Sequence, residues 1–178
     1  AAEIEASLKR LARIAERLLQ LARAEGGRLR LDRASDLRIA ARLVVDDMAR
    51  TAPNRIALAL PERSVMSGLD PDAFGIICRN LIENALRHGA PDEPIEVSLT
   101  EGGTLRVAND GPVVPKAALG RLTRRFERGT AMADGSGLGL AIVAGIADRI
   151  SSQLILHSPR PGRSAGFEAA LVLPVNPQ

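Results

Sequence analysis

Two asparagines, Asn80 and Asn84, stand four residues apart in the segment RNLIENALRHG. On a helix this spacing places both on one face, with Asn84 at the edge of the buried stripe and Asn80 and Arg87 just beyond it. The expected stripe consists of Phe74, Ile77, Leu81 and Ala85. An amide oxygen at Asn84 suits Mg²⁺, which keeps waters and shares phosphate oxygens, and Arg87 could then meet a phosphate. Without a ligand, the two amides would be solvated or would cap a neighbouring loop.

The segment LRVANDGP ends in a third asparagine, Asn109. Along a strand, Leu105, Val107 and Asn109 point to one face and Asp110 to the other. If the two apolar residues face the core, Asn109 is a polar group at the inner end of a strand and needs a partner. Its amide offers an acceptor and a donor, which match the amino group and ring nitrogen of adenine. Alternatively, Asn-Asp-Gly-Pro forms an Asx-turn that ends the strand.

Three glycines alternate in DGSGLGLAI, at Gly135, Gly137 and Gly139, and an apolar run follows at once. Glycine tolerates positive φ and lets a ligand approach the main chain. Backbone N–H groups at a helix start could therefore surround an anion here. A glycine-rich hinge or surface loop is the alternative.

A long helix is expected at residues 3–24, which contain no Gly or Pro. Its heptad seam consists of Ile4, Leu8, Leu11, Ala15, Leu18 and Ala22. Because one helix cannot bury such a face by itself, we expect it to pack on helices from another chain or from further sequence, in preference to its own domain. Gly26 and Gly27 should end it.

Helix and strand patterns alternate from Arg28 onward. Strands are expected at 28–31, 55–60, 65–68, 95–99, 105–109, 154–158 and 167–173, and helices at 36–51, 71–89 and 138–150. Asp70 and Pro71 start the second of these helices, and strict alternation on both sides of Glu101-Gly102-Gly103 indicates a hairpin. Residues 111–136 read as a long loop with at most a short helix. The class is α+β, with helices layered on a mainly antiparallel sheet.

The amino-acid composition argues against several classes of function. The chain has 178 residues, a net charge of +3, three Phe and no Trp or Tyr, which argues against a binder of single-stranded nucleic acid because such proteins stack bases on aromatic rings. We therefore expect no nucleic acid among its partners. Cys78 is the only cysteine, so an intrachain disulfide and a cysteine-based zinc cluster are excluded. No apolar run of transmembrane length occurs.

In order, these segments resemble the ATP-binding domain of bacterial sensor histidine kinases in the GHKL superfamily. NLIENALRHG is similar to the N box, NDGPVVP to the first glycine box, RRFERG to the F box and GSGLGLAIV to the second glycine box. The resemblance covers about residues 35–174. The leading helix, which contains LLQLAR, resembles the second helix of the family's dimerisation and phosphotransfer hairpin.

The resemblance implies a Bergerat-type fold, a two-layer α/β sandwich with helices on one face of a mixed, mainly antiparallel sheet. It divides the chain into a truncated hairpin helix at 1–25 and a catalytic domain at 26–178, with an ATP lid at about 112–136. Carried over by position, Asn84 is the Mg²⁺ ligand and Asn109 reads adenine. The other residues implied to bind ATP are Asn80, Arg87, His88, Asp110, Gly111, Arg128, Gly135, Ser136, Gly137, Leu138, Gly139 and Leu140.

The implied activity is transfer of the γ-phosphoryl group of Mg-ATP to a histidine on a dimerisation helix. That histidine is absent, because His88 lies in the N box and His157 in a C-terminal strand. The implied partners are the chain's own phosphoacceptor helix, a second subunit in a homodimer, and a response regulator with a receiver domain. The implied location is a cytoplasmic domain of a protein anchored in the bacterial inner membrane.

Departures from the family pattern leave two alternatives. The position that reads adenine is usually Asp and is here Asn109; Asp110 is the other candidate, but strand parity favours Asn109. Val113 replaces a glycine, and Thr123 replaces a phenylalanine of the F box. A degenerate nucleotide-sensing module without catalysis would fit these changes. A GHKL hydrolase is the second alternative, but it places a glutamate four residues before the metal-binding asparagine, where this chain has Asn80.

Overall fold

The computed structural model describes residues 29–123 and 138–176, together with positions 5, 8, 12, 15, 19, 20, 22 and 26. Those eight positions are helical, including Gly26, which the sequence predicted as a helix stop. One glycine costs a helix only about 1 kcal/mol, so it need not end one. Leu8 and Leu19, two of the described positions, are exposed. At Gln20, however, the helix does contact its own domain, since Gln20 accepts a hydrogen bond from Asn80.

A five-stranded sheet forms one layer of the molecule, in the order β2-β4-β5-β7-β6. Its strands are β2 (Ile56–Ala59), β4 (Ile95–Leu99), β5 (Thr104–Asn109), β6 (Leu154–His157) and β7 (Phe167–Val172). Only β2 and β4 pair in parallel; the other neighbours are antiparallel. The predicted mixed, mainly antiparallel sheet is confirmed.

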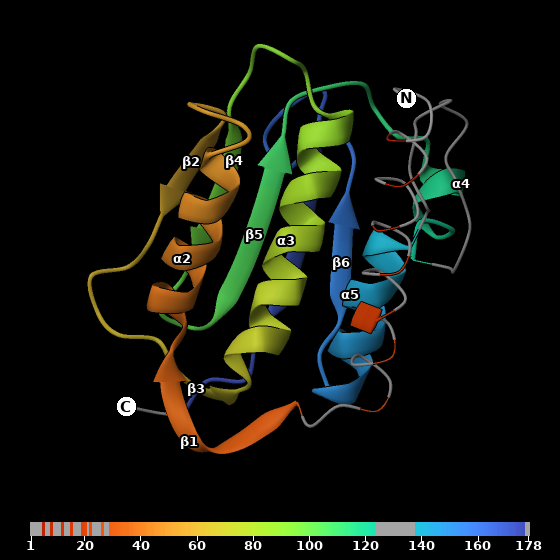
Figure 1. The fold of residues 1–178 in the computed structure, drawn as a ribbon. Helices are drawn as coiled ribbons and strands as arrows, with labels where there is room; N and C mark the ends of the chain where they lie inside the picture. The colour runs from red at the N-terminus through yellow and green to blue at the C-terminus, as the bar shows by residue number, and fades with distance from the viewer. Residues whose placement is uncertain are drawn as a thin grey trace.

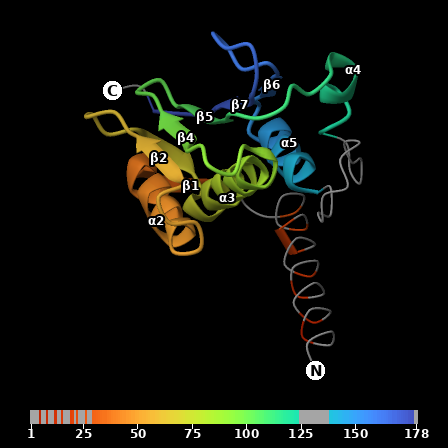
Figure 2. The same ribbon diagram turned by 90° about the horizontal axis from the view of Figure 1, so that it is seen from above.

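Three helices lie side by side on one face of this sheet (Figures 1 and 2). They are α2 (Leu37–Ala49), α3 (Pro71–His88) and α5 (Gly139–Arg149). The core lies between the two layers, where Phe74, Ile82, Ile95 and Leu105 are fully buried. Among the described residues, no helix covers the opposite face. The α+β class and the two-layer sandwich are therefore confirmed.

The α3 helix has clear start and stop signals. Asp70 caps its first turn by accepting a hydrogen bond from the Asp72 backbone N–H, and Pro71 occupies the first helical position. At the other end, Gly89 donates its N–H to the Ala85 carbonyl and adopts an extended conformation. These signals set α3 so that its C-terminal end lies beside the C-terminal end of β5 (Figure 1).

A turn at Glu101–Gly103 joins β4 to β5, as the alternation predicted. Gly103 adopts a φ of +79°, which favours glycine. A Cβ atom there would lie 2.5 Å from Val175 Cγ1 and 2.8 Å from the Leu173 carbonyl oxygen. The turn therefore depends on glycine for both conformation and space, and it fixes the register that carries Asn109.

A separate two-stranded sheet, which the sequence did not predict, pairs β1 (Arg30–Asp36) with β3 (Met66–Leu69). The strand expected at 28–31 in fact begins at Arg30 and runs to Asp36. Its second half, RASD, has no alternating apolar pattern and becomes a strand only through pairing with β3.

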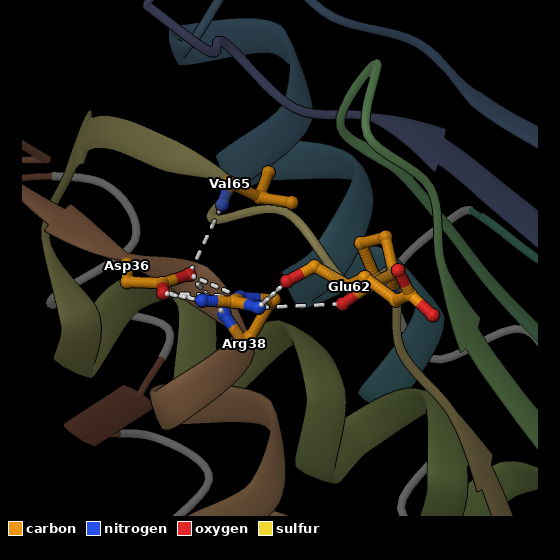
Figure 3. A network of polar contacts seen from close by, with 5 residues as sticks. Asp36, Arg38, Glu62 and Val65 are labelled. Atoms are coloured by element: carbon orange, nitrogen blue, oxygen red, sulfur yellow. Dashed lines mark hydrogen bonds and ion pairs between the residues drawn. The ribbon is translucent and has the colours of Figure 1, made fainter.

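At the end of β1, Asp36 caps α2 and holds a polar network (Figure 3). Its carboxylate accepts hydrogen bonds from the backbone N–H groups of Arg38 and Val65, each at 3.1 Å. The Arg38 guanidinium donates to the same carboxylate at 2.7 Å and to the Glu62 carbonyl. The network lowers the pKa of Asp36, chiefly through the hydrogen bond from Arg38.

Other elements agree with the sequence reading. Strands β6 and β7 form the predicted closing pair, and α5 lies within the predicted span 138–150. The short helix α4 (Lys116–Leu119) lies in the loop expected to hold at most one. No helix in the described part of the chain is long and apolar enough to cross a membrane.

Candidate nucleotide-binding site

The two α3 asparagines differ in burial, and in the opposite sense to the prediction. Asn80, expected beyond the apolar stripe, is only 2% exposed, whereas Asn84 is partly buried. Asn80 Nδ2 donates to the Ile76 carbonyl at 2.8 Å and to Gln20 Oε1 at 3.2 Å. The prediction was wrong because α3 lies between two other helices (Figure 2), so more than one stripe of it is covered.

The C-terminal end of α3 carries Asn84, with Arg87 and His88 in the last turn. Arg87 and His88 are exposed at the surface beyond the buried stripe. Desolvation at the helix end lowers the pKa of His88, and the positive charge of Arg87 adds to the effect. The lowered pKa favours the neutral imidazole at pH 7, so within this end of α3 the positive charge comes from Arg87.

Asn109 ends β5 on the face toward the core, as strand parity predicted. Leu105 is fully buried, and Asn109 is only 3% exposed. Asn109 Nδ2 donates to the Asp110 carbonyl at 3.1 Å, but Asn109 Oδ1 is buried and has no hydrogen-bond partner. A buried acceptor without a partner costs about 1–3 kcal/mol. Asn109 therefore presents an acceptor that a ligand could satisfy.

Two glycines lie against this amide. At Gly89, a Cβ atom would lie 3.2 Å from Asn109 Nδ2 and 2.6 Å from the Ala85 carbonyl oxygen. At Gly111, a Cβ atom would lie 3.0 Å from the His88 carbonyl oxygen and 3.5 Å from Asn109 Nδ2. Side chains at either position would collide with these atoms, so glycines from two motifs allow the backbone to pack closely against the Asn109 amide.

The neighbouring residue, Asp110, faces the other side of the sheet. Its carboxylate lies 3.4 Å from Arg160 Nη1, and Arg160 Nη2 lies 2.6 Å from Glu96 Oε2. The glutamate accounts for most of the rise in the Arg160 pKa, and Asp110 contributes less. The structure therefore pairs Asp110 within the chain, whereas it leaves the oxygen of Asn109 unpaired.

The N-terminus of α5 supplies the other predicted group of residues. Leu138 is its N-cap and makes no side-chain capping bond, and no acidic residue lies in the first turn. The side chains of Leu138 and Leu140 are buried, so they fix the helix on the core, and only backbone N–H groups near Gly139 could meet an anion. Arg128, Gly135, Ser136 and Gly137 lie outside the described residues.

Within the described residues, no group of three or more His, Cys, Asp or Glu side chains could hold a metal ion. A metal held by the Asn84 amide oxygen could complete its ligands with phosphate and water oxygens. This donor set fits Mg²⁺, which keeps several waters and binds through substrate phosphates.

Sequence reasoning missed two residues of this region. Arg160 lies in the connection between β6 and β7, where no motif marks it. Gly166 borders the same corner, because a Cβ atom there would lie 2.6 Å from the Asn109 carbonyl oxygen and 3.1 Å from Arg160 Cδ. Nothing in the sequence distinguishes Gly166 from other glycines in polar loops. Its contact with Asn109 follows only from the antiparallel pairing of Asn109 with Phe167.

Comparison with known proteins identifies the fold's family. A family model described as histidine kinase-, DNA gyrase B- and HSP90-like ATPase matches residues 69–177, more than half of the chain. The chain belongs to this ATPase family. The matched region contains the α3 asparagines, Asn109 and the start of α5. Membership in the ATPase family, with sensor kinases among the relatives, supports ATP binding and two-component signalling.

Two relatives illustrate the extent of similarity within the ATPase family. The sensor protein CseC of Streptomyces avermitilis is 40% identical over 99 residues, covering 54% of this chain and 20% of that protein. The probable sensor histidine kinase TcrY of Mycobacterium tuberculosis is 31% identical over 181 residues, covering 97% of this chain and 37% of that protein. The chain thus spans between a fifth and two fifths of the length of these relatives.

A solved structure, full-length ShkA in complex with AMPPNP, shares the fold of the chain. It superposes with a TM-score of 0.76 at 22% identity, covering 99% of this chain and 38% of that one. At this identity the likeness concerns the fold alone.

Proposed function

We propose that this chain binds Mg-ATP and transfers its γ-phosphoryl group to a histidine on a dimerisation helix. The observation that carries the proposal is the buried, unpartnered Oδ1 of Asn109, which lies beside the end of the helix that bears Asn84. Family membership and the sensor kinases among the relatives support the same function.

At the base end of the site, Asn109 is proposed to read adenine. Its free Oδ1 can accept a hydrogen bond from the amino group of the base, and the second N–H of its amide can donate to a ring nitrogen. The first N–H already bonds to the Asp110 carbonyl, which sets the orientation of the amide. Gly89 and Gly111 pack closely against this amide, which helps to hold it in place.

At the phosphate end, Asn84 is proposed to hold Mg²⁺, with Asn80, Arg87 and His88 nearby. When bound, the ion would neutralise phosphate charge. The exposed Arg87 adds positive charge, and the uncapped first turn at Leu138 and Gly139 offers N–H groups. The proposed ATP-binding residues also include three that support the contacts from behind, namely Leu140, Gly111 and Asp110. The remaining proposed ATP-binding residues are Gly135, Ser136, Gly137 and Arg128. Such a site acts by positioning and by stabilising charge.

Transfer is favoured over hydrolysis because the described site lacks a general base at the relevant position. Hydrolysis requires a group that activates water. At the position where GHKL hydrolases carry a glutamate, Asn80 has an amide that already donates to Ile76 and Gln20. A carboxamide is too weak a base to take a proton from water, so Asn80 cannot replace the glutamate.

The rest of the proposal concerns the larger protein. Residues 1–25 are proposed to be the second helix of a dimerisation hairpin, and residues 26–178 the catalytic domain, with its lid at about 112–136. The exposed Leu8 and Leu19 support a bundle completed by a second subunit. A response regulator would accept the phosphoryl group, and the whole protein would be anchored in the inner membrane with this part in the cytoplasm.

The direct test mixes the chain with a separately supplied phosphoacceptor helix hairpin and ATP labelled at the γ-phosphate. We expect labelled hairpin with the wild type and none with Asn84→Ala. Calorimetry with ATP and ADP, with and without Mg²⁺, gives the binding arm. Binding without transfer to any hairpin would favour the nucleotide-sensing alternative, and free phosphate without a labelled hairpin would favour the hydrolase.

A further inference from the structure

Arg160 lies on the face of the sheet opposite the helices and belongs to none of the sequence motifs. It comes from the connection between β6 and β7, and its side chain is only 11% exposed. Its guanidinium bridges Glu96 on β4, at 2.6 Å, and Asp110 at the end of β5, at 3.4 Å. The two carboxylates are 51% and 39% exposed. A nearly buried arginine thus ties two half-exposed carboxylates together just behind Asn109.

This bridge acts on the residue next to the proposed base reader. The Asp110 carbonyl accepts hydrogen bonds from Asn109 Nδ2, at 3.1 Å, and from the Ala90 N–H, at 2.7 Å. The same residue's carboxylate is held by Arg160 on the outer face. Whatever fixes Asp110 therefore also fixes the direction of the Asn109 amide and leaves Oδ1 free on the inner face.

Gly166 makes room for Arg160 at this corner. Its φ is +84°, and a Cβ atom there would collide with the Asn109 carbonyl oxygen and lie 3.1 Å from Arg160 Cδ. Its N–H donates to the Gly111 carbonyl at 2.9 Å. The arginine stem therefore packs against Gly166, whose backbone in turn contacts Asn109 and Gly111, so a shift of Arg160 would be passed on to them.

We propose that Arg160 is a positioning residue that sets the selectivity for the nucleotide base, an inference that rests on the proposed ATP binding. By holding the Asp110 carboxylate on the outer face, it leaves the Asn109 amide as the group that meets the base. Released, that carboxylate would compete for the amide N–H groups and turn Oδ1 away. The site would then lose its preference for a purine with a 6-amino group over one with a 6-oxo group.

The test compares ATP with inosine triphosphate, which carries a 6-oxo group, by calorimetry on the full chain with Mg²⁺. The variants are Arg160→Met, which keeps the length of the stem, and Arg163→Met, a matched control at an exposed arginine of the same loop. Because Arg160→Met leaves the half-exposed carboxylates of Glu96 and Asp110 without their cation, thermal unfolding checks that the fold persists.

We expect the wild type and Arg163→Met to prefer ATP, and Arg160→Met to lose about tenfold in ATP affinity with little change for inosine triphosphate, as expected for one misdirected hydrogen bond. A general structural defect would weaken both nucleotides equally. In the double variant Arg160→Met with Asp110→Ala, the ATP preference should return, because the competing carboxylate is gone.

The outcomes distinguish the proposed role of Arg160 from the proposed ATP binding on which it rests. If the wild type binds ATP with a preference that Arg160→Met retains, or if the double variant stays as poor as Arg160→Met, the role of Arg160 is overturned while ATP binding stands. If the wild type binds neither nucleotide, both proposals are overturned.

Discussion

Asp36 and Asn109 are two polar residues that end strands close to the core, and the structure treats them differently. Asp36 ends β1 and accepts hydrogen bonds from two backbone N–H groups and a guanidinium (Figure 3). Asn109 ends β5, is more deeply buried, and has an oxygen with no partner. The hydrogen-bonding groups of Asp36 are satisfied within the chain, whereas Asn109 Oδ1 would need a partner from outside it.

The difference separates a structural polar group from a candidate binding group. A buried polar atom that the chain satisfies stabilises the fold, and a buried atom left unpaired costs free energy. Such a cost is understandable where a ligand relieves it. Asp36 should therefore matter for stability and Asn109 for binding, and the following expectations test that contrast.

The largest effect should come from Asp36→Ala. Loss of the helix cap and of the Val65 N–H acceptor should lower the free energy of unfolding by about 2–3 kcal/mol. Urea unfolding measures this change. The ATP affinity measured by calorimetry should stay within about twofold of the wild-type value, which is too small a change for a lost contact with the nucleotide. The matched control is Asp70→Ala, which removes the cap of α3 and with it only one backbone hydrogen bond. It should lower the free energy of unfolding by about 1 kcal/mol.

Asn109→Ala should show the reverse pattern. ATP affinity should fall on the order of thirtyfold, because the proposed acceptor for the base is lost. The free energy of unfolding should change by less than about 1 kcal/mol, because removing an unpaired oxygen offsets the loss of the bond to the Asp110 carbonyl. Asn109→Asp, which keeps an acceptor, should retain most of the affinity; equal losses in both variants would contradict the proposed role.

A smaller effect is expected from Asp110→Ala, since the Asp110 carboxylate is paired, as that of Asp36 is, but half-exposed. The free energy of unfolding should fall by no more than about 1 kcal/mol. ATP affinity should fall by less than about threefold, which is less than the loss expected when a hydrogen bond to the nucleotide is removed. A greater loss of ATP affinity than in Asn109→Ala would overturn the assignment made from strand parity.

The smallest effect concerns pH. The pKa of Asp36 is lowered in the folded protein, so its carboxylate adds stability at neutral pH that is lost as pH falls below about 4 and through the folded value. Asp36→Asn should therefore show a shallower loss of stability than the wild type on acidification in this range. Asn109→Ala, which does not titrate, should follow the slope of the wild type; a parallel slope in Asp36→Asn would refute the linkage.

Much of the fold was predictable because it follows from local signals. Asp70, Pro71 and Gly89 mark the ends of α3, and the hairpin around Gly103 follows from strict alternation. The strand β1 was not predictable over its full length, because its polar second half is shaped by pairing with β3. Gly26 was also misread, since it is itself helical.

For the site, strand parity correctly placed Asn109 inward, because a strand has a period of two residues whatever surrounds it. The burial of Asn80 was misjudged, because the helical pattern shows one stripe and not how many neighbours cover a helix. The roles of Asn84, Arg87 and the glycines before α5 stay predictions.

The sequence by itself determined the class of fold, the order of the motifs and the inward direction of Asn109, because these depend on local chemistry and on periodicity. Only the tertiary structure decided that the oxygen of Asn109 has no partner, that Asp110 is paired with Arg160, and that Gly166 lies against both the Asn109 carbonyl and Arg160. Whether a polar atom is satisfied depends on residues far away along the chain, and those distances exist only once the sheet has formed.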